Sequence, residues 1–382
     1  MIVEKWFDPI KLMLTKWVEP KDWELLSSFE QSLNQITQDK GKNLPLQAKV
    51  LLASQGYGMI DVDSKLGGKG RSHLLQALVQ FICGYHNLDY RDVAHVGHGK
   101  MIVLHGSDKQ RKLWLPKMAS GSLVGIAATE EHGGSRVQNT KTIARRNGRA
   151  YFLNGEKVYI SRLKEAAVFV VFFKFEQDET LSAALIKPSR KGIKTEFWEP
   201  IGLKGWSWGK MTFENSPIIN QDVLGARGQG VAIFKEHFVY YRPMVAMTTL
   251  GVAAAVLDQT MAHINMRISR KDIAIPRDTA LEDFADHYAG INAAMLSTLC
   301  AIAQNVENTA HSSLWSRSGK AWSVEQAYRA VSDLSLLMGA AAFRADHFAA
   351  KALCDLRGFL LADGIHDALR RSAGRALMDL PS

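Results

Sequence analysis

The sequence predicts an α+β protein with helices at both ends and a β domain between them. Two observations support this prediction. Short apolar or alternating runs, such as AYFLNG, AVFVVFFKF and GKMTFEN, lie between residues 122 and 225, separated by Gly, Asn and Pro as is typical of antiparallel strands. Long Ala-rich segments such as EQAYRAVSDLSLLMGAAAF follow to the end of the chain and predict a helical bundle.

We therefore expect three domains: helices over residues 1–121, strands over 122–225 and a bundle over 226–382. In the first domain, apolar residues around Leu46–Gln55 and Leu74–Tyr85 recur at helical spacing, with turns such as SKLGGKGRS between them. In the second, the pairs Asn147-Gly148 and Asn154-Gly155 are strong signals for tight turns between paired strands.

Composition limits the class of protein. Of the 382 residues, 47% are hydrophobic and 22% charged, as in soluble globular proteins. No apolar run approaches the length expected of a membrane span, and the first residues do not resemble a signal peptide. The cysteines Cys83, Cys300 and Cys354 lie far apart, and no HExxH or similar spacing predicts a metal site. A reducing cytoplasm fits best.

The formal net charge of +9 bears on partners rather than on fold. Nucleic acid, an anionic membrane and an acidic protein are all compatible with it. The basic residues form only short clusters, at Lys109–Lys112, Arg145–Arg149 and Arg267–Lys271. Without a long basic tract or interleaved aromatic residues, binding to nucleic acid is not expected.

One acidic residue near the C-terminus, Asp363 in LLADGIHDALRR, interrupts a helical pattern. Because Asp and Gly favour helix starts over helix interiors, Asp363 is a candidate N-cap for the last helix. The alternative is a carboxylate held at a chain turn so that it faces a ligand. Residue statistics favour the cap but leave both interpretations open.

Several segments resemble the acyl-CoA dehydrogenase family, in the family's order and over nearly the whole chain. They are HGSDKQRKLWLPKMASGSLVGIAATEEHGGS, LNGEKVYISRL, IGLKGWSWGKMTFEN, DVLGARGQGVAIF and YYRPMVAMTTLGVAAAV. The resemblance implies an N-terminal helical domain, a middle β domain, a C-terminal four-helix domain, FAD and a homodimer or homotetramer. It also implies oxidation of an acyl thioester, in which a base removes the proton alpha to the carbonyl and a hydride passes to the flavin.

The family's base is a glutamate in a Y-E-G-T turn near the C-terminus. Aligned without a gap from Gly339, that turn falls on residues 362–365, which places Asp363 at the catalytic position. Aspartate is one methylene shorter than glutamate, so either the substrate sits closer or the chemistry differs. Some relatives carry the base just before the arginine of the first C-terminal helix, which is Tyr241 here, and tyrosine titrates near pH 10.

The same resemblance assigns the other site residues. Cofactor contacts fall on Ile126, Ala128, Thr129, Tyr159, Ser161, Arg267 and Gly339, and substrate contacts on Ser135 and Arg242. Tyr159 and Ser161 replace the usual Trp and Thr beside the flavin ring, and so keep an aromatic face and a hydroxyl. The chain also departs from the family pattern at Arg136, Arg270-Lys271, Leu336 and Cys354-Asp355, which marks it as a divergent member.

From these features we expect an FAD-dependent dehydrogenase of a small, polar acyl group, of seryl or glyceryl type, on an acyl or peptidyl carrier protein. Such enzymes make aminomalonyl- or hydroxymalonyl-type extender units for polyketides and nonribosomal peptides, and carrier proteins are acidic. Alternatives are a short-chain acyl-CoA dehydrogenase, a flavin monooxygenase that lacks a base, and a basic flavoprotein that associates with DNA. The carboxylate at 363 argues against the monooxygenase, and the absence of a basic tail argues against DNA.

Overall fold

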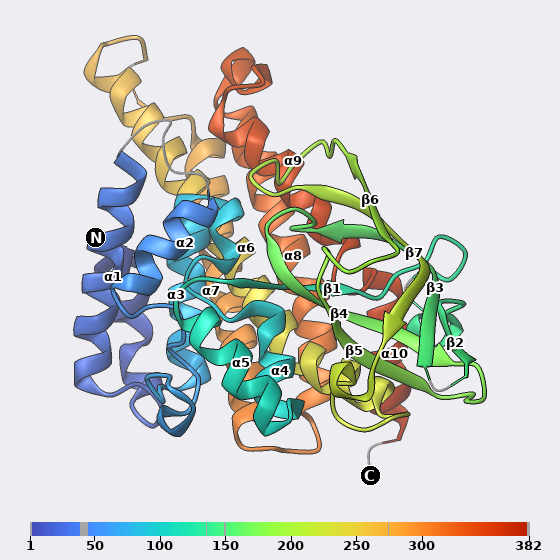
Figure 1. Cartoon of the computed structure of the whole chain (residues 1–382). Helices are drawn as coiled ribbons and strands as arrows, with labels where there is room; N and C mark the ends of the chain where they lie inside the picture. Colours follow the sequence, from blue (N-terminus) through green and yellow to red (C-terminus); the bar gives the residue numbers. More distant parts are fainter. Residues whose placement is uncertain (1, 39–44, 135, 149, 274, 380–382) are drawn as a thin grey trace.

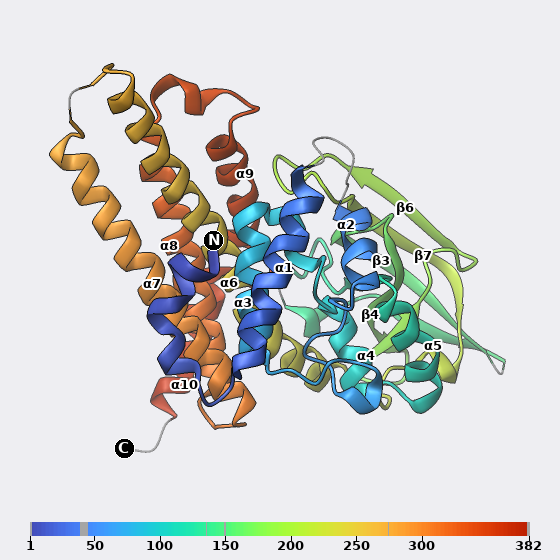
Figure 2. The same ribbon diagram turned by 90° about the vertical axis from the view of Figure 1, so that its left-hand side faces the viewer.

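The computed structural model describes residues 2–38, 45–134, 136–148, 150–273 and 275–379 of the chain. Helices come first, a sheet follows and a helical bundle ends the chain, in the predicted order (Figure 1). The bundle and the sheet occupy opposite sides of the molecule (Figure 2).

The N-terminal region is helical. Its elements are η1 (Val3–Phe7), η2 (Asp8–Leu14), α1 (Pro20–Gln38), α2 (Pro45–Ser54), η3 (Ser64–Leu66), α3 (His73–His86), η4 (Leu88–Asp92), η5 (Gly97–Gly99), α4 (Lys100–His105) and α5 (Asp108–Ala119). The two helices predicted from apolar spacing are α2 and α3. The start of α3 is fixed by Ser72, whose hydroxyl accepts a hydrogen bond from the Leu75 N–H, as an N-cap does.

The middle region is a seven-stranded sheet. Its elements are β1 (Leu123–Ala127), η6 (Val137–Asn139), β2 (Ile143–Asn147), β3 (Ala150–Ser161), β4 (Ala166–Phe175), β5 (Leu181–Ile186), β6 (Ile193–Trp198), β7 (Trp208–Ile218) and η7 (Asn220–Asp222). The strands lie in the order β1-β4-β2-β3-β7-β6, and β5 pairs with β4.

The sheet is mixed, which corrects the prediction of a purely antiparallel domain. β4 pairs in parallel with both β1 and β2, whereas the other pairings are antiparallel. β3 folds back on β2 as an antiparallel hairpin. β4, which follows β3 in the chain, runs parallel to β2 and pairs with its other edge. Runs of apolar residues identify strands but do not specify which neighbour each strand takes.

One of the two predicted turns is confirmed and the other is wrong. The β2–β3 hairpin turn carries Gly148 at φ +61°. Asn154-Gly155 instead lies inside β3, where the register with β7 shifts. A Cβ on Gly155 would come within 2.7 Å of Thr142, so this glycine permits a close approach of two chain segments rather than a turn.

The C-terminal region is a bundle of long helices. They are α6 (Gly230–Ser269), α7 (Asp278–Val306), α8 (Ser312–Leu336), η8 (Gly339–Phe343), α9 (Phe348–Leu361) and α10 (His366–Met378). α3 joins the same hydrophobic core and crosses α6 closely. A Cβ on Gly84 would lie 1.8 Å from the Thr248 carbonyl oxygen, and one on Gly251 would lie 2.0 Å from that of Phe81. Glycines on both helices therefore allow the crossing.

Two of these helices, α6 and α7, are long and apolar enough to span a bilayer by length and composition, contrary to the expectation from sequence. In α6, 83% of the most apolar window is buried within the protein, as in a core helix. In α7 the corresponding share is 39%, and this helix packs against α6 and α8. Length and hydropathy alone are weak evidence for a membrane span.

Candidate active site

Asp363 lies in the connection between α9 and α10, at φ +57°, a backbone conformation uncommon for residues other than glycine. α9 ends at Leu361, and the N-cap of α10 is Ile365, where no side chain caps the helix. The helix-cap interpretation of Asp363 is therefore wrong. Among the described residues Asp363 hydrogen-bonds through its backbone carbonyl, and its half-buried carboxylate remains free to take another partner.

Two cationic side chains hold the turn formed by residues 362–364. Lys320 of α8 donates from Nζ to the carbonyl oxygens of Ala362 (2.7 Å) and Gly364 (3.1 Å). Arg242 of α6 donates from Nε to the carbonyl oxygen of Asp363 over 2.8 Å. The resemblance assigns Arg242 to substrate binding, and in the structure one of its donors fixes the turn.

The surroundings of Asp363 favour a carboxylate that can accept a proton. Burial raises the pKa of its carboxyl group above the ordinary value, and positive charges partly oppose that shift. These charges belong to Lys320, Arg162, Arg242 and Arg91. A general base works best when its pKa lies near the operating pH, so a raised pKa suits that role.

Two buried arginines distinguish this site from a purely apolar slot. Arg91 of η4 is 5% exposed and donates from Nη2 to the Ser161 hydroxyl over 3.1 Å. Arg162, 4% exposed, pairs with the buried carboxylate of Asp92, which raises the pKa of the guanidinium against the effect of burial. Nη1 of Arg91 makes only a long ion pair with Oδ1 of Asp89, at 3.9 Å, and Nε of Arg162 has no hydrogen-bond partner within the described part of the chain. Both could therefore serve a polar group of a ligand.

Tyr241 of α6 lies beside Asp92, the carboxylate that pairs with Arg162, and does not take the place of a base. Its hydroxyl is 3.5 Å from Oδ1 of Asp92, and the side chain is buried. Burial and the nearby Asp92 carboxylate raise the pKa of Tyr241, which takes this residue further from a role in accepting a proton. The structure thus argues, as the residue type does, against a base at this position.

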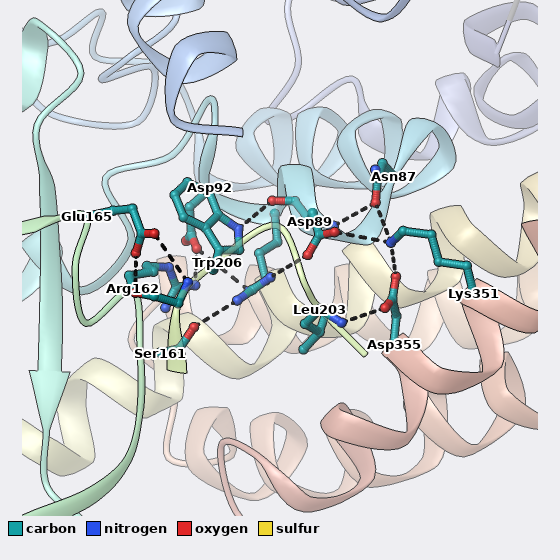
Figure 3. A network of polar contacts seen from close by, with 12 residues as sticks. Asn87, Asp89, Asp92, Ser161, Arg162, Glu165, Leu203, Trp206, Lys351 and Asp355 are labelled. Carbon is teal, nitrogen blue, oxygen red and sulfur yellow. Dashed lines mark hydrogen bonds and ion pairs between the residues drawn. The ribbon is translucent and has the colours of Figure 1, made fainter. Parts of the chain in front are cut away.

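The polar network around the two arginines extends to all three regions of the chain (Figure 3). Asp89 of η4 accepts a hydrogen bond from Lys351 of α9 through Oδ2 (3.1 Å), and its backbone carbonyl accepts one from the Trp206 indole (2.7 Å). Lys351 also pairs with Asp355 of the same helix, and Asp355 accepts the Leu203 N–H over 2.6 Å. The network fixes α9, and with it the turn carrying Asp363, against the other two regions.

The residues predicted to contact the flavin ring meet where β1 ends and β3 bends. The Lys157 ammonium group donates to the Ala128 carbonyl oxygen over 3.2 Å, and the Val158 N–H donates to that of Thr129 over 2.9 Å. Ile126, Ala128, Thr129 and Ser161 are half-buried, so part of each side chain remains accessible. This edge, with apolar surface, a threonine and a serine hydroxyl, fits a planar flavin.

The buried carboxylate of Glu130 holds this edge in place. It accepts hydrogen bonds from the Thr142 N–H (3.0 Å) and from the Lys157 ammonium group (2.7 Å). Although burial would raise the pKa of Glu130, Lys157 and the hydroxyl donors lower it to about 2. The charged network therefore ties the end of β1 to β2 and β3.

Unusual backbone conformations gather around the site. Seven non-glycine residues among those described have φ between +49° and +64°, and four of them are Tyr159, Arg162, Leu203 and Asp363. Tyr159 sits at a register shift in β3, is 53% exposed and stacks on Trp208 at a ring-centroid distance of 5.6 Å. Strained conformations concentrate where function requires a fixed geometry.

The remaining predicted residues lie elsewhere. Arg267 is near the end of α6, and Gly339, at φ +63°, opens η8. The α6–α7 and α8–α9 connections lie at the same end of the bundle, away from the sheet (Figures 1 and 2). Ser135 lies outside the described residues. The structure of one chain therefore brings Ser161 and Asp363 close to Arg91, ties Thr129 to Val158 of β3 and places Arg267 and Gly339 in other parts of the bundle.

Sequence reasoning missed Arg91, Arg162 and Lys320. Each lies in a segment that carries other charged residues beside apolar or small ones: NLDYRDVAHV, VYISRLKEA and RSGKAWSVE. These cations therefore look like ordinary surface charges in the sequence, and only their burial in the structure identifies them as paired or functional groups. Two surface hollows, of about 330 and 340 Å³, contain none of these residues, so the site is recognised by its chemistry.

Comparisons with known proteins give one consistent result. Residues 32–122, 125–216 and 228–378 match the family models for the N-terminal, middle and C-terminal domains of acyl-CoA dehydrogenases. A probable acyl-CoA dehydrogenase of Bacillus subtilis is 34% identical over 215 residues, which make up 54% of this chain and 36% of that protein. The match thus spans only about a third of that relative's length.

Solved structures agree on the fold. The acyl-CoA dehydrogenase from Geobacillus kaustophilus superposes with a TM-score of 0.87 at 19% identity, over 95% of this chain and 99% of the other. An acyl-CoA dehydrogenase from Bacillus anthracis, solved in complex with FAD, superposes with a TM-score of 0.86 at 22% identity, over 94% of this chain and 67% of the other.

Proposed function

Because the chain belongs to the acyl-CoA dehydrogenase family, whose cofactor is FAD, we propose that it oxidises a small, polar acyl thioester. Asp363 takes the proton alpha to the thioester carbonyl. FAD, held along the edge formed by Thr129, Tyr159 and Ser161, supplies the acceptor for the hydride. Lys320 and Arg242 fix the turn from which Asp363 acts.

The observation that carries the polar substrate is the pair of buried guanidinium groups around Asp363. Among the described residues, Nη1 of Arg91 and Nε of Arg162 have no hydrogen-bond partner, and Nη1 of Arg91 has only the ion pair with Asp89 at 3.9 Å. A long apolar acyl chain would leave those groups unsatisfied, at a cost of about 1–3 kcal/mol each. The oxygen of a hydroxyl or carboxyl substituent close to the thioester can accept hydrogen bonds from these guanidinium groups.

We further propose that the thioester is presented on an acyl or peptidyl carrier protein in extender-unit biosynthesis. The positive net charge supports this, because it favours encounter with an acidic partner. Lys109 and Lys112 are exposed on α5, and Arg146 is exposed at the end of β2. Arg145 is offset by Glu176 at 3.6 Å, and Arg149 lies outside the described residues.

Two further properties belong to the same proposal. Assembly into a homodimer or homotetramer would bring Arg267 and Gly339 of one chain to the cofactor of another, which is the role expected of them. A cytoplasmic location agrees with the three cysteines, Cys83, Cys300 and Cys354, which form no disulfide.

The test is anaerobic reduction of the bound flavin, followed as bleaching of its visible absorbance. Seryl and glyceryl thioesters are offered on a carrier protein and on CoA, with butyryl-CoA as the apolar comparison. Bleaching by the polar acyl groups, and faster on the carrier protein, is the expected result. Faster bleaching by butyryl-CoA would favour the alternative function, a short-chain acyl-CoA dehydrogenase. No bleaching by any thioester would overturn the proposal.

A further inference from the structure

Lys320 is buried in the bundle and faces the connection between α9 and α10. Its side chain is 1% exposed, and Nζ lies 2.8, 2.7 and 3.1 Å from the carbonyl oxygens of Phe359, Ala362 and Gly364. Three acceptors require three N–H donors, which a lysine has only as the ammonium ion. The geometry is therefore that of a charged lysine bound to backbone.

These bonds do more than cap the end of α9. The Phe359 and Ala362 carbonyls belong to the last turn of that helix and its C-cap, but the Gly364 carbonyl lies beyond Asp363. Lys320 thus binds the chain on both sides of Asp363, and Arg242 binds the carbonyl of Asp363 itself. Three consecutive carbonyls of the turn are held by cations from two different helices.

The carboxylate depends on this support, because it makes no hydrogen bond of its own within the described part of the chain. An aspartate is short, so the backbone of the turn decides where the carboxylate stands. Displacement of a reacting group by about 1 Å can cost on the order of 100-fold in rate.

We propose that Lys320 is a positioning residue, whose ammonium group holds the turn at residues 362–364 and so places the Asp363 carboxylate for proton removal. As a statement about catalysis, this inference rests on the proposed function. Lys320 itself touches neither substrate nor cofactor in this scheme and acts through Asp363.

The charge of Lys320 gives the inference a pH signature. Burial lowers the pKa of Lys320 to about 7, against the attraction of Asp363. Loss of a proton from Lys320 would remove one of the three N–H donors of its ammonium group and the positive charge beside the Asp363 carboxylate. The other ionisable groups that interact with this pair are Arg91 of η4, Arg162 after β3, Arg242 and Tyr241 of α6, Glu325 of α8 and His366 of α10.

The first measurement needs no substrate. The carbonyl band of protonated Asp363 is followed by difference infrared spectroscopy across pH, with Asp363→Asn as the blank. Lys320→Met should raise the midpoint of that titration by roughly 1 pH unit or more, because an opposite charge nearby favours the ionised carboxylate. Lys320→Arg, which keeps the charge, should leave the midpoint of the Asp363 titration close to that of the wild type.

Lys49→Met is the matched control. Lys49 is also buried, binds only backbone carbonyls (those of Asp92 and His95, at 2.7 and 2.8 Å) and has its pKa lowered by burial to about 8. Its loss should reduce stability without moving the Asp363 titration. An unmoved midpoint in Lys320→Met, or an equal shift in Lys49→Met, would overturn the inference.

Flavin reduction then separates this inference from the proposed function. In Lys320→Met the rate should fall by roughly 10- to 100-fold, with unchanged FAD content and little change in the thioester concentration that gives half the maximal rate. The wild-type rate should decline above about pH 7 as Lys320 loses its proton, and this decline should be absent in Lys320→Arg, since arginine stays protonated. If Asp363→Asn is inactive while Lys320→Met keeps the wild-type rate and pH profile, only the role of Lys320 fails. If Lys320→Met moves the infrared midpoint but no thioester reduces the wild-type flavin, the proposed function fails and the support of Asp363 by Lys320 stands.

Discussion

Arg91 donates a hydrogen bond from Nη2 to the hydroxyl of Ser161 over 3.1 Å. The bond links η4 of the helical region to the end of β3, where the flavin is expected. Burial raises the pKa of Asp363, and the charge of the same guanidinium offsets part of that rise. One buried cation therefore stands between the residue assigned to proton removal and the strand assigned to the hydride acceptor, and the predictions for activity follow from this arrangement.

Replacement of Asp363 by Asn should leave FAD bound and slow flavin reduction by at least about 100-fold, because a general base contributes roughly 10²–10⁴. Asp363→Glu keeps the carboxylate but moves it by about one C–C bond, so its rate should lie between those of the wild type and Asp363→Asn. Stopped-flow absorbance under anaerobic conditions measures both. Asp367→Asn, an exposed acid in the first turn of α10, is the matched control and should keep the wild-type rate. A wild-type rate in Asp363→Asn would remove this residue from the mechanism.

Arg91→Met should weaken the use of polar acyl thioesters more than that of butyryl-CoA. A hydrogen bond from a charged donor contributes about 1.5–3 kcal/mol, so kcat/KM for the polar substrate should fall roughly 10- to 100-fold. The ratio of kcat/KM values for seryl- and butyryl-thioesters is the measurement. Arg190→Met, which removes a guanidinium of the β5–β6 connection that pairs with Asp222 of η7, is a control that should leave the ratio unchanged. Equal losses for both substrates in Arg91→Met would show that this arginine supports the fold rather than substrate choice.

Asp355 should be important for stability through its place in the network of Figure 3. It is 2% exposed and accepts hydrogen bonds from Leu203 and Lys351. Asp355→Ala should lower the free energy of unfolding by about 1–3 kcal/mol, because the Leu203 N–H loses its acceptor and the partly exposed Lys351 loses one of its two carboxylate partners. A double-mutant cycle with Lys351→Met, measured by urea denaturation, should give a coupling of about 0.5–3 kcal/mol. Additive losses would mean that the two side chains do not act together.

Much of this fold could be predicted from sequence, because the period of apolar residues changes from helical to strand-like and back. The sheet order could not, since β4 inserts beside β2 and leaves the hairpin partner β3 to pair with β7. Asn154-Gly155 was misassigned for a related reason. A strand bulge and a turn need the same backbone freedom, and only the neighbour at Thr142 distinguishes them.

The site assignments of Asp363, Thr129 and Ser161 rest on resemblance, because short motifs carry them, and they stay predictions. The support around them could not be predicted from the sequence. Lys320 acts on carbonyls that lie some 40 residues further along the chain, with a sequence separation of 39 from Phe359. Arg91 meets Ser161 across a separation of 70 residues. Such contacts depend on how helices and sheet are packed, which no local pattern encodes.

Acid should destabilise the protein in a pH window set by three buried histidines, His95, His98 and His237. Burial lowers the pKa of His95 to about 4, of His237 to about 3 and of His98 well below its ordinary value. In the unfolded chain each titrates near 6.5, so between pH 6.5 and 4 the unfolded state binds more protons. Stability is then complete above pH 6.5 and is lost as the pH falls, by about 2 kcal/mol per histidine at pH 5.

Urea denaturation at pH 7, 6 and 5 measures this loss. Asp355 and Asp363 act in the opposite sense, because their pKa values are raised and the folded protein takes up their protons first. His237→Asn keeps both aspartates, so their contribution cancels when the pH dependence of its stability is compared with that of the wild type. Asparagine can keep a hydrogen bond to His98, whose Nδ1 lies 2.9 Å from Nε2 of His237. The variant should lose about 2 kcal/mol less than the wild type between pH 7 and pH 5, whereas the same pH dependence in both would exclude His237 as a source of acid sensitivity.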